Sequence, residues 1–178
     1  MDHPDPVGVY FNVLKLGDKC TVVRGNHDNY LAEYITKYYE TPERKRKRLP
    51  PYLYDTFELL QQRLTPADIQ ELAQGILSLP LQICVELEGV NYLMAHAMTS
   101  HPEQRRSDDY FLLGGHNDRA FLQNGIPGYV SICGHSNVGG GSIWKNTLGN
   151  VYKCDCGYGF TGSRLGCLCL ETGEVYYV

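Results

Sequence analysis

Three apolar segments of the sequence each lead into a side chain that can bind a metal. The segments and their side chains are 20–23 with Asn26, 90–95 with His96, and 129–133 with His135. An amide oxygen and two imidazole nitrogens form a ligand set that suits Mn, Fe, Zn or Ni better than Mg or Ca. His27, next to Asn26, can protonate a leaving oxygen if its ring faces the substrate. The pattern predicts a divalent-metal site with a general acid beside it.

Each of these residues also has a simpler interpretation. Asn26 can cap a strand-to-helix turn while His27 is merely solvated, and a single histidine after a strand often only bonds a backbone carbonyl. The three together are harder to explain in this way, because open α/β sheets place their sites at the carboxyl ends of strands.

The elements that must position these residues follow from hydrophobic periodicity. Helical spacing predicts helices at 5–16, 30–40, 52–63 and 65–79, with Pro66 in the first turn of the last helix. Alternation and short apolar runs predict strands at 20–23, 81–87, 90–95 and 129–133, and further strands within 151–178. Turns are expected at Glu88-Gly89 and Thr172-Gly173. The pattern indicates one mixed α/β domain spanning residues 1–178.

Composition excludes several classes of protein. The net charge of −4 argues against a protein that binds nucleic acid or an anionic membrane, and no apolar run reaches the length of a membrane-spanning helix. The amino end lacks the layout of a signal peptide, and the seven cysteines indicate reduced thiols in a cytoplasmic protein. The basic run at 41–51 fits a solvated loop better than a nucleic-acid or localisation patch.

Two cysteine pairs in the tail could suggest a zinc site. Cys154 and Cys156, like Cys167 and Cys169, are separated by one residue. Structural zinc sites usually place two to four residues between ligands, whereas this spacing puts both thiols on one face of a strand. We expect buried thiols rather than zinc ligands.

The motifs that carry these residues resemble those of one family. RGNHD at 24–28, MAHA at 94–97 and CGHSNVG at 133–139 are similar, in order and rough spacing, to the calcineurin-like metallophosphoesterases, and most of all to their serine/threonine phosphoprotein phosphatase branch. The tail from Asp155 also resembles that branch. The resemblance implies an α/β fold, a metallophosphoesterase β-sandwich of mixed sheets flanked by helices (αββα, four-layer).

The resemblance also implies roles for individual residues. Asn26, His96 and His135 would bind one metal of a two-metal centre. His27 would be the general acid while a metal-activated water attacks phosphorus in line. A substrate-binding arginine is expected between the later histidines, which points to Arg119 before Arg105 or Arg106. His116 is not expected to be a ligand.

The chain departs from the family at its start. The motifs Gly-Asp-x-His-Gly and Gly-Asp-x-x-Asp-Arg-Gly do not occur in it, and Asp2 and His3 lie at the wrong place to replace them. The resemblance therefore implies an incomplete domain, the carboxyl two-thirds, with one metal or none in this chain and an uncovered sheet edge open to self-association.

Two function classes remain open. The first is a metal-dependent hydrolase, with manganese among its candidate metals, that acts on a phosphorylated protein or a small phosphomonoester. A dinucleoside-polyphosphate hydrolase is a variant of this class. The second is a truncated, non-catalytic remnant that binds at most one metal.

Overall fold

The chain folds into two compact units, Met1–Leu79 and Pro80–Val178. The computed structural model describes residues 5–114, 118–157 and 164–178. Over these residues the architecture is mixed α/β, with seven α-helices, a five-stranded mixed sheet and a two-stranded hairpin. No helix in the described part of the chain is long and apolar enough to cross a membrane.

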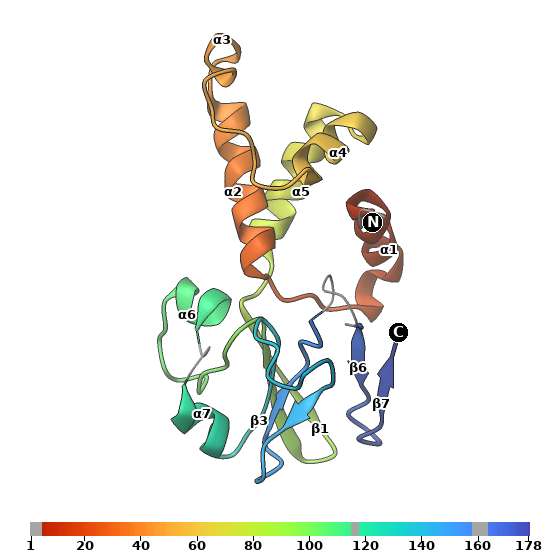
Figure 1. Cartoon of the computed structure of the whole chain (residues 1–178), viewed down its shortest axis with the longest axis vertical. Helices are drawn as coiled ribbons and strands as arrows, with labels where there is room; N and C mark the ends of the chain where they lie inside the picture. Colours follow the sequence, from red (N-terminus) through yellow and green to blue (C-terminus); the bar gives the residue numbers. More distant parts are fainter. Residues whose placement is uncertain (1–4, 115–117, 158–163) are drawn as a thin grey trace. The chain divides into compact units, whose positions relative to one another are not determined.

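The first unit is helical (Figure 1). Its helices are α1 (Pro6–Leu16), α2 (Asn26–Glu40), α3 (Glu43–Arg46), α4 (Thr56–Arg63) and α5 (Pro66–Ser78), with a 3₁₀ turn at Gly17–Lys19. α2 packs along α5, and α1 packs against α4. The predicted helices at 5–16 and 65–79 are thus confirmed within a residue or two, while the helix predicted from residue 52 begins at Thr56.

Local chemistry fixes where these helices begin and end. Thr65 and Asp68 form a reciprocal capping box at the start of α5, in which the Thr65 hydroxyl accepts from the Asp68 amide and the Asp68 carboxylate accepts from the Thr65 amide. At the carboxyl end of α2, Arg46 donates to the carbonyls of Tyr38, Tyr39 and Thr41 and lies over the rings of both tyrosines. One cation of the basic run therefore closes a helix, and the rest of the run is largely exposed.

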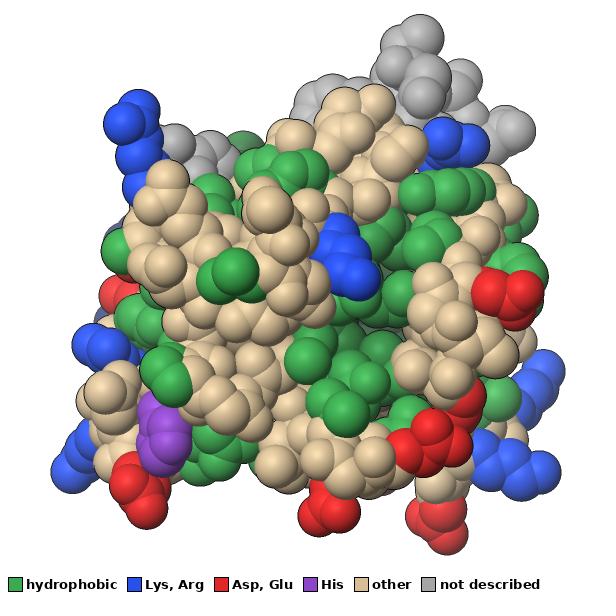
Figure 2. All heavy atoms as spheres, turned by 90° about the horizontal axis from the view of Figure 1, so that it is seen from below, with side chains coloured by type: hydrophobic (Ala, Val, Ile, Leu, Met, Phe, Trp, Pro, Cys, Tyr) green, Lys and Arg blue, Asp and Glu red, His purple; other side chains and the backbone are tan. Residues whose placement is uncertain are grey.

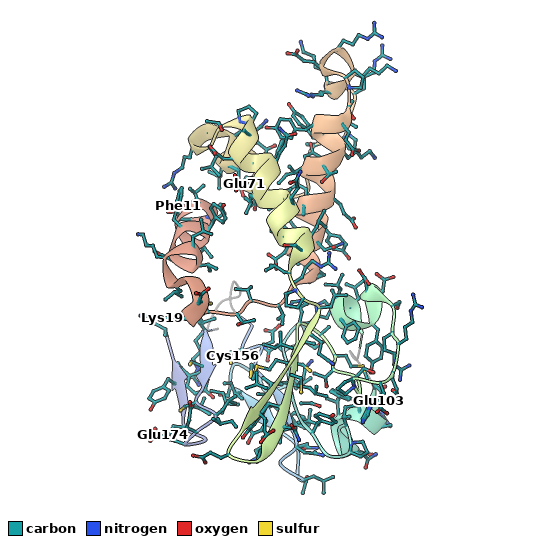
Figure 3. The ribbon with its side chains drawn as sticks, turned by 180° about the vertical axis from the view of Figure 1, so that it is seen from behind. Phe11, Lys19, Glu71, Glu103, Cys156 and Glu174 are labelled. Carbon is teal, nitrogen blue, oxygen red and sulfur yellow. The ribbon has the colours of Figure 1, made fainter. Side chains whose placement is uncertain are left out.

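The core of the first unit lies between α2, α4 and α5. Its buried apolar side chains come from all four long helices: Val7, Leu31, Ala32, Ile35, Phe57, Leu60, Ile69, Leu72 and Ala73. α1 contributes only Val7 to this core. It leaves large apolar side chains exposed, among them Val9, Leu14 and Phe11, which is labelled in Figure 3.

The second unit is built on one sheet. The strands β1 (Gln82–Leu87), β2 (Val90–Ala95), β3 (Val130–Cys133), β4 (Trp144–Lys145) and β5 (Val151–Lys153) lie in the order β1-β2-β3-β5-β4. β2, β3 and β5 are parallel, and β1 and β4 are antiparallel edges. The β1–β2 turn is the predicted Glu88-Gly89, and both residues have positive φ, as a two-residue hairpin turn requires.

Two short helices and a hairpin complete this unit (Figure 1). α6 (Asp108–Leu113) and α7 (Arg119–Asn124) supply Tyr110 and Phe121 to a core cluster that includes Cys133 and Val151. The hairpin pairs β6 (Gly166–Leu168) with β7 (Val175–Tyr177) around the predicted turn at Gly173. The Tyr177 hydroxyl accepts a hydrogen bond from the amide of Ile143, which ties the hairpin to the loop before β4.

Charged side chains of both signs are interspersed on the surface. Figure 2 shows one face, on which acidic and basic side chains lie around exposed apolar ones. β1 adds to the exposed apolar surface, because Val85 is 40% exposed on this edge strand. The sequence predicts that alternate side chains of β1 are buried, but none of the six is fully buried in the structure.

Two predictions from the sequence are wrong in detail. Residues 20–23 are not a strand, since they pair with none of the described strands and so lack ladder hydrogen bonds. The tail cysteines do not form two buried pairs within strands. β5 ends at Lys153, before Cys154, and Cys167 is exposed in the hairpin, so only Cys156 is fully buried. Figure 3 labels Cys156, whose sulfur packs against Gly166.

Candidate functional site

The structure brings His96 and His135 together. Each follows the carboxyl end of a strand, and β2 and β3 are adjacent and parallel, with Ala95 paired to Cys133. The His96 Nε2 lies 3.2 Å from the His135 Nδ1, and the two ring centroids are 5.1 Å apart. The amide of Gly134 donates to the His96 carbonyl at 2.7 Å, which locks the two strand ends to each other. Sheet register therefore sets the distance between the imidazoles.

This separation fits two ligands of one metal ion. With metal–nitrogen bonds of about 2.0–2.1 Å, two ligand nitrogens lie about 2.9 Å apart at a right angle and about 3.3 Å apart at a tetrahedral angle. The observed 3.2 Å falls within that range. No group of three or more His, Cys, Asp or Glu side chains in metal-binding geometry occurs among the described residues. Two imidazoles alone do not fill the shell of such a metal, so further ligands of another kind, such as amide oxygens or water, would have to complete it.

The backbone at His135 is strained. Its φ is +63°, in the left-handed region that side chains with a Cβ rarely adopt. The amide of Ser136 donates to the carbonyl of Gly134 at 2.7 Å, which closes a γ-turn centred on His135. This classical form of the γ-turn is rare and costs free energy, and such strain gathers at functional sites. The turn directs the His135 ring toward His96.

A buried lysine lies next to the histidine pair. Lys153 is 1% exposed at the end of β5, opposite Cys133 in the ladder, and its ammonium donates to the Ala97 carbonyl at 3.1 Å. Burial lowers the pKa of Lys153. Burial also raises the pKa of Cys133 to about 11, and that of Cys154 to about 12. Lys153 thus bonds the residue after His96 and holds β5 to the end of β2.

Asn26 and His27 open α2 in the first unit. Asn26 is 7% exposed, whereas His27 is exposed. The preceding turn is stabilised by Asp28, whose carboxylate accepts from the Gly25 amide at 2.9 Å, and by the buried Arg24, which donates to the Leu77 carbonyl. Successive helical residues point about 100° apart, so the two neighbours cannot face the same way. The helix predicted at 30–40 is present but begins earlier, at Asn26, and it follows coil rather than the predicted strand.

His27 lies in a pocket with aromatic and acidic walls. Its ring is 5.1 Å from that of Tyr54, and its carbonyl accepts from the Tyr52 hydroxyl at 3.4 Å. Asp28 and Asp55 supply two carboxylates, and the pocket has a volume of about 370 Å³.

The arginine predictions fare differently. Arg119 is an exposed side chain at the first residue of α7, and its role as a substrate-binding residue stays a prediction. Arg106 has structural partners, since it lies 4.7 Å over the Tyr110 ring and donates to Gln104 and Ser100. Arg105 is exposed, and His116 lies outside the described residues.

Reasoning from the sequence missed Lys153 and the tyrosines around His27. Val151 and Lys153 are two residues apart in β5 and therefore lie on the same face of the strand. A lysine on the apolar face of a strand is unusual, and this could have drawn attention to Lys153. Tyr52 and Tyr54 gave no such signal. They lie in the segment between Pro51 and α4, and only the tertiary structure brings them to His27.

Comparisons with known proteins bear on the fold alone. No family model matches the chain, and no curated protein matches it. The chain is similar in structure to a hypothetical protein, PH1004, from Pyrococcus horikoshii OT3, known from its crystal structure. The TM-score is 0.53 at 16% sequence identity, over 98% of this chain and 69% of that one. At this identity the likeness supports the mixed α/β architecture.

Proposed function

We propose that the chain belongs to a lineage of metal-dependent phosphoesterases whose substrates are phosphoserine or phosphothreonine side chains of proteins. The observation that carries the proposal is the 3.2 Å approach of His96 Nε2 and His135 Nδ1 at the carboxyl edge of two parallel strands. Asn26, His96 and His135 are the proposed ligands. Bound there, a divalent cation such as Mn²⁺ would supply Lewis-acid activation of water and of the phosphoryl group.

The chain's own residues have separate tasks in this proposal. The two imidazoles act as neutral ligands, each presenting a nitrogen lone pair, and the Ala97 carbonyl bonded by Lys153 keeps the His96 turn in place. His27 donates a proton to the oxygen of the leaving alcohol, and its exposed ring at the start of α2 is accessible to such a group. Arg119 is proposed to pair with a phosphoryl oxygen.

The same proposal includes the fold, an αββα sandwich. The five-stranded sheet, with α6 and α7 packed on it, corresponds to one sheet of the αββα sandwich expected from the motif resemblance. The β6–β7 hairpin corresponds to part of the second sheet. We propose that the two units together belong to one domain of that fold.

The test combines metal content with turnover. The purified chain is analysed by mass spectrometry for bound metal and assayed with p-nitrophenyl phosphate in added Mn²⁺. The proposal predicts metal bound in proportion to chain, and turnover that His27→Ala reduces by a factor of about 10²–10⁴. A metal-free chain with no turnover in any divalent metal would contradict it.

A second candidate function is a non-catalytic metal-binding remnant. It is favoured by the lack of a third His, Cys, Asp or Glu beside the histidine pair in the described ranges. One metal on two imidazoles and an amide activates water poorly compared with a two-metal centre. One metal per chain without turnover would select this candidate over the enzyme.

A further inference from the structure

The pocket beside His27 is lined by aromatic and acidic side chains. Three rings, those of His27, Tyr52 and Tyr54, stand around it, and Tyr52 and Tyr54 approach edge to face at 6.0 Å. Asp28 and Asp55 add two carboxylates, and none of the side chains that line it is a lysine or arginine. Leu31 and Thr56 complete the lining. The pocket therefore combines π faces, negative charge and a small apolar area.

This combination favours an organic cation. Aromatic faces attract cations through the ring quadrupole, and a nearby carboxylate adds Coulomb attraction. The amino end of α2 carries a partial positive charge, but Asp28 in the first turn offsets it by accepting the Gly25 amide. The pKa of Tyr52 is raised, first by burial and then by Tyr54 and Asp28, which agrees with rings and carboxylate lying close together. An anionic group would meet two carboxylates.

We propose that this pocket binds the guanidinium or ammonium group of an arginine or lysine side chain in a peptide. A guanidinium can stack on Tyr54 while a carboxylate accepts its N–H groups, and the stem of the side chain can lie against Leu31.

The proposal also names a substrate class, and this part depends on the proposed function. If His27 protonates the leaving oxygen, the pocket beside it receives the leaving group, which in a phosphoprotein is the peptide around the phosphorylated serine or threonine. Phosphopeptides with a basic residue next to that serine or threonine should then be the preferred substrates. A nucleoside leaving group could stack on the tyrosines but, being uncharged, would gain no Coulomb attraction from the carboxylates.

Binding is tested with two unphosphorylated peptides that differ only in having arginines or alanines beside a central serine. Isothermal titration calorimetry with the full chain should give at least about tenfold tighter binding of the arginine peptide, declining with added salt. Tyr54→Ala and Asp55→Asn should each reduce this preference to about threefold or less. The Asp55 side chain makes no capping hydrogen bond at the start of α4, so Asp55→Asn should leave that helix start in place.

Tyr176→Ala is the matched control. Tyr176, like Tyr54, is an exposed tyrosine, and its hydroxyl donates to the Glu174 carboxylate, but it lies in the hairpin rather than in this pocket. This variant should keep the full preference for the arginine peptide. Equal binding of both peptides by the unmodified chain, or a preference that Tyr54→Ala and Asp55→Asn leave intact, would overturn the proposal, as would tighter binding of adenosine than of the arginine peptide.

Turnover separates this inference from the proposed function. With the phosphorylated forms of the two peptides, kcat/KM should favour the arginine peptide by a similar factor, and Asp55→Asn should reduce that ratio. Turnover without discrimination would overturn the inference and leave the phosphoesterase standing. Discrimination in binding without any turnover would uphold the pocket and reject the enzyme.

Discussion

The two halves of the predicted site are positioned by different kinds of structure. His96 and His135 follow adjacent parallel strands whose hydrogen bonds fix the distance between them. Asn26 and His27 follow the coil at 20–25 and open a helix, where one is 7% exposed and the other is exposed. A sheet edge thus makes neighbouring side chains converge, whereas a helix start makes them diverge. The first arrangement suits ligands of one ion, and the second suits two separate tasks.

The largest expected difference concerns metal affinity. His135→Ala removes one of two converging nitrogens and should weaken Zn²⁺ or Mn²⁺ binding at least about a thousandfold, or about 4 kcal/mol. His27→Ala should change the affinity by less than about threefold, because the proposed acid is not a ligand. Calorimetric titration of both variants measures the contrast. His101→Ala is the control, because the His101 ring packs edge to face on Tyr129 and is not a proposed ligand. Equal losses in the His27 and His135 variants would remove the distinction between the two halves.

The core beneath α2 gives the next effect. Ile35 is fully buried, so Ile35→Ala should lower the free energy of unfolding by about 3 kcal/mol through lost burial and a cavity. Val9→Ala on α1, where the side chain is 60% exposed, should change it by less than about 0.5 kcal/mol. Urea unfolding followed by circular dichroism checks both. A cost for Val9→Ala as large as that for Ile35→Ala would mean that the exposed face of α1 is covered in solution.

The strand end beneath His135 should respond to alkaline pH. Because burial raises the pKa of Cys133 from 9.0 to about 11, the folded state keeps the thiol protonated where the unfolded state ionises it. The resulting stabilisation is complete below pH 9.0 and is lost as pH rises toward 11. Lys153, whose pKa burial lowers, acts in the opposite sense, since its unfavourable contribution shrinks as pH rises toward 10.5.

A difference measurement isolates the thiol. The stability gap between the unmodified chain and Cys133→Ala should narrow by about 2 kcal/mol between about pH 8 and about pH 11. Urea unfolding at each pH supplies the values, and Cys84→Ala serves as the control because Cys84 is exposed in β1. A stability difference that does not change with pH would show that the Cys133 thiol is not shielded from water in the folded state.

The smallest effect distinguishes local from tertiary control of the helices. Thr65→Ala removes the hydroxyl that accepts from the Asp68 amide and should cost about 1 kcal/mol. Thr65→Ser retains the capping hydroxyl and should lower the free energy of unfolding by only a few tenths of a kcal/mol. If thermal unfolding showed no difference between the two variants, the capping box would contribute nothing to where α5 begins.

Local signals in the sequence were sufficient for much of the fold. Pro66 in the first turn of α5, the turn at Glu88-Gly89 and the apolar run at 90–95 were local signals, and each element formed as predicted. Residues 20–23 have the same apolar character, yet they form no strand, because a strand needs a neighbour and periodicity cannot supply one. Propensity predicts an element only where its partner also exists.

The same distinction applies to the candidate site. His96 and His135 were identifiable because each follows a predicted strand, and adjacent parallel strands end at one edge. Their nitrogen-to-nitrogen distance, the γ-turn at His135 and the buried Lys153 depend on sheet register, which the sequence does not reveal. The rings around His27 depend on the packing of the segment before α4 and were likewise invisible.

The most direct test of the central claim is nitrogen-15 NMR of the histidine side chains during titration with Zn²⁺. The account predicts that His96 Nε2 and His135 Nδ1 shift together and saturate near one equivalent, while His27 and His101 change little. Shifts at His27 or His101 with none at the pair, or no binding at all, would contradict the assignment of His96 and His135 as metal ligands.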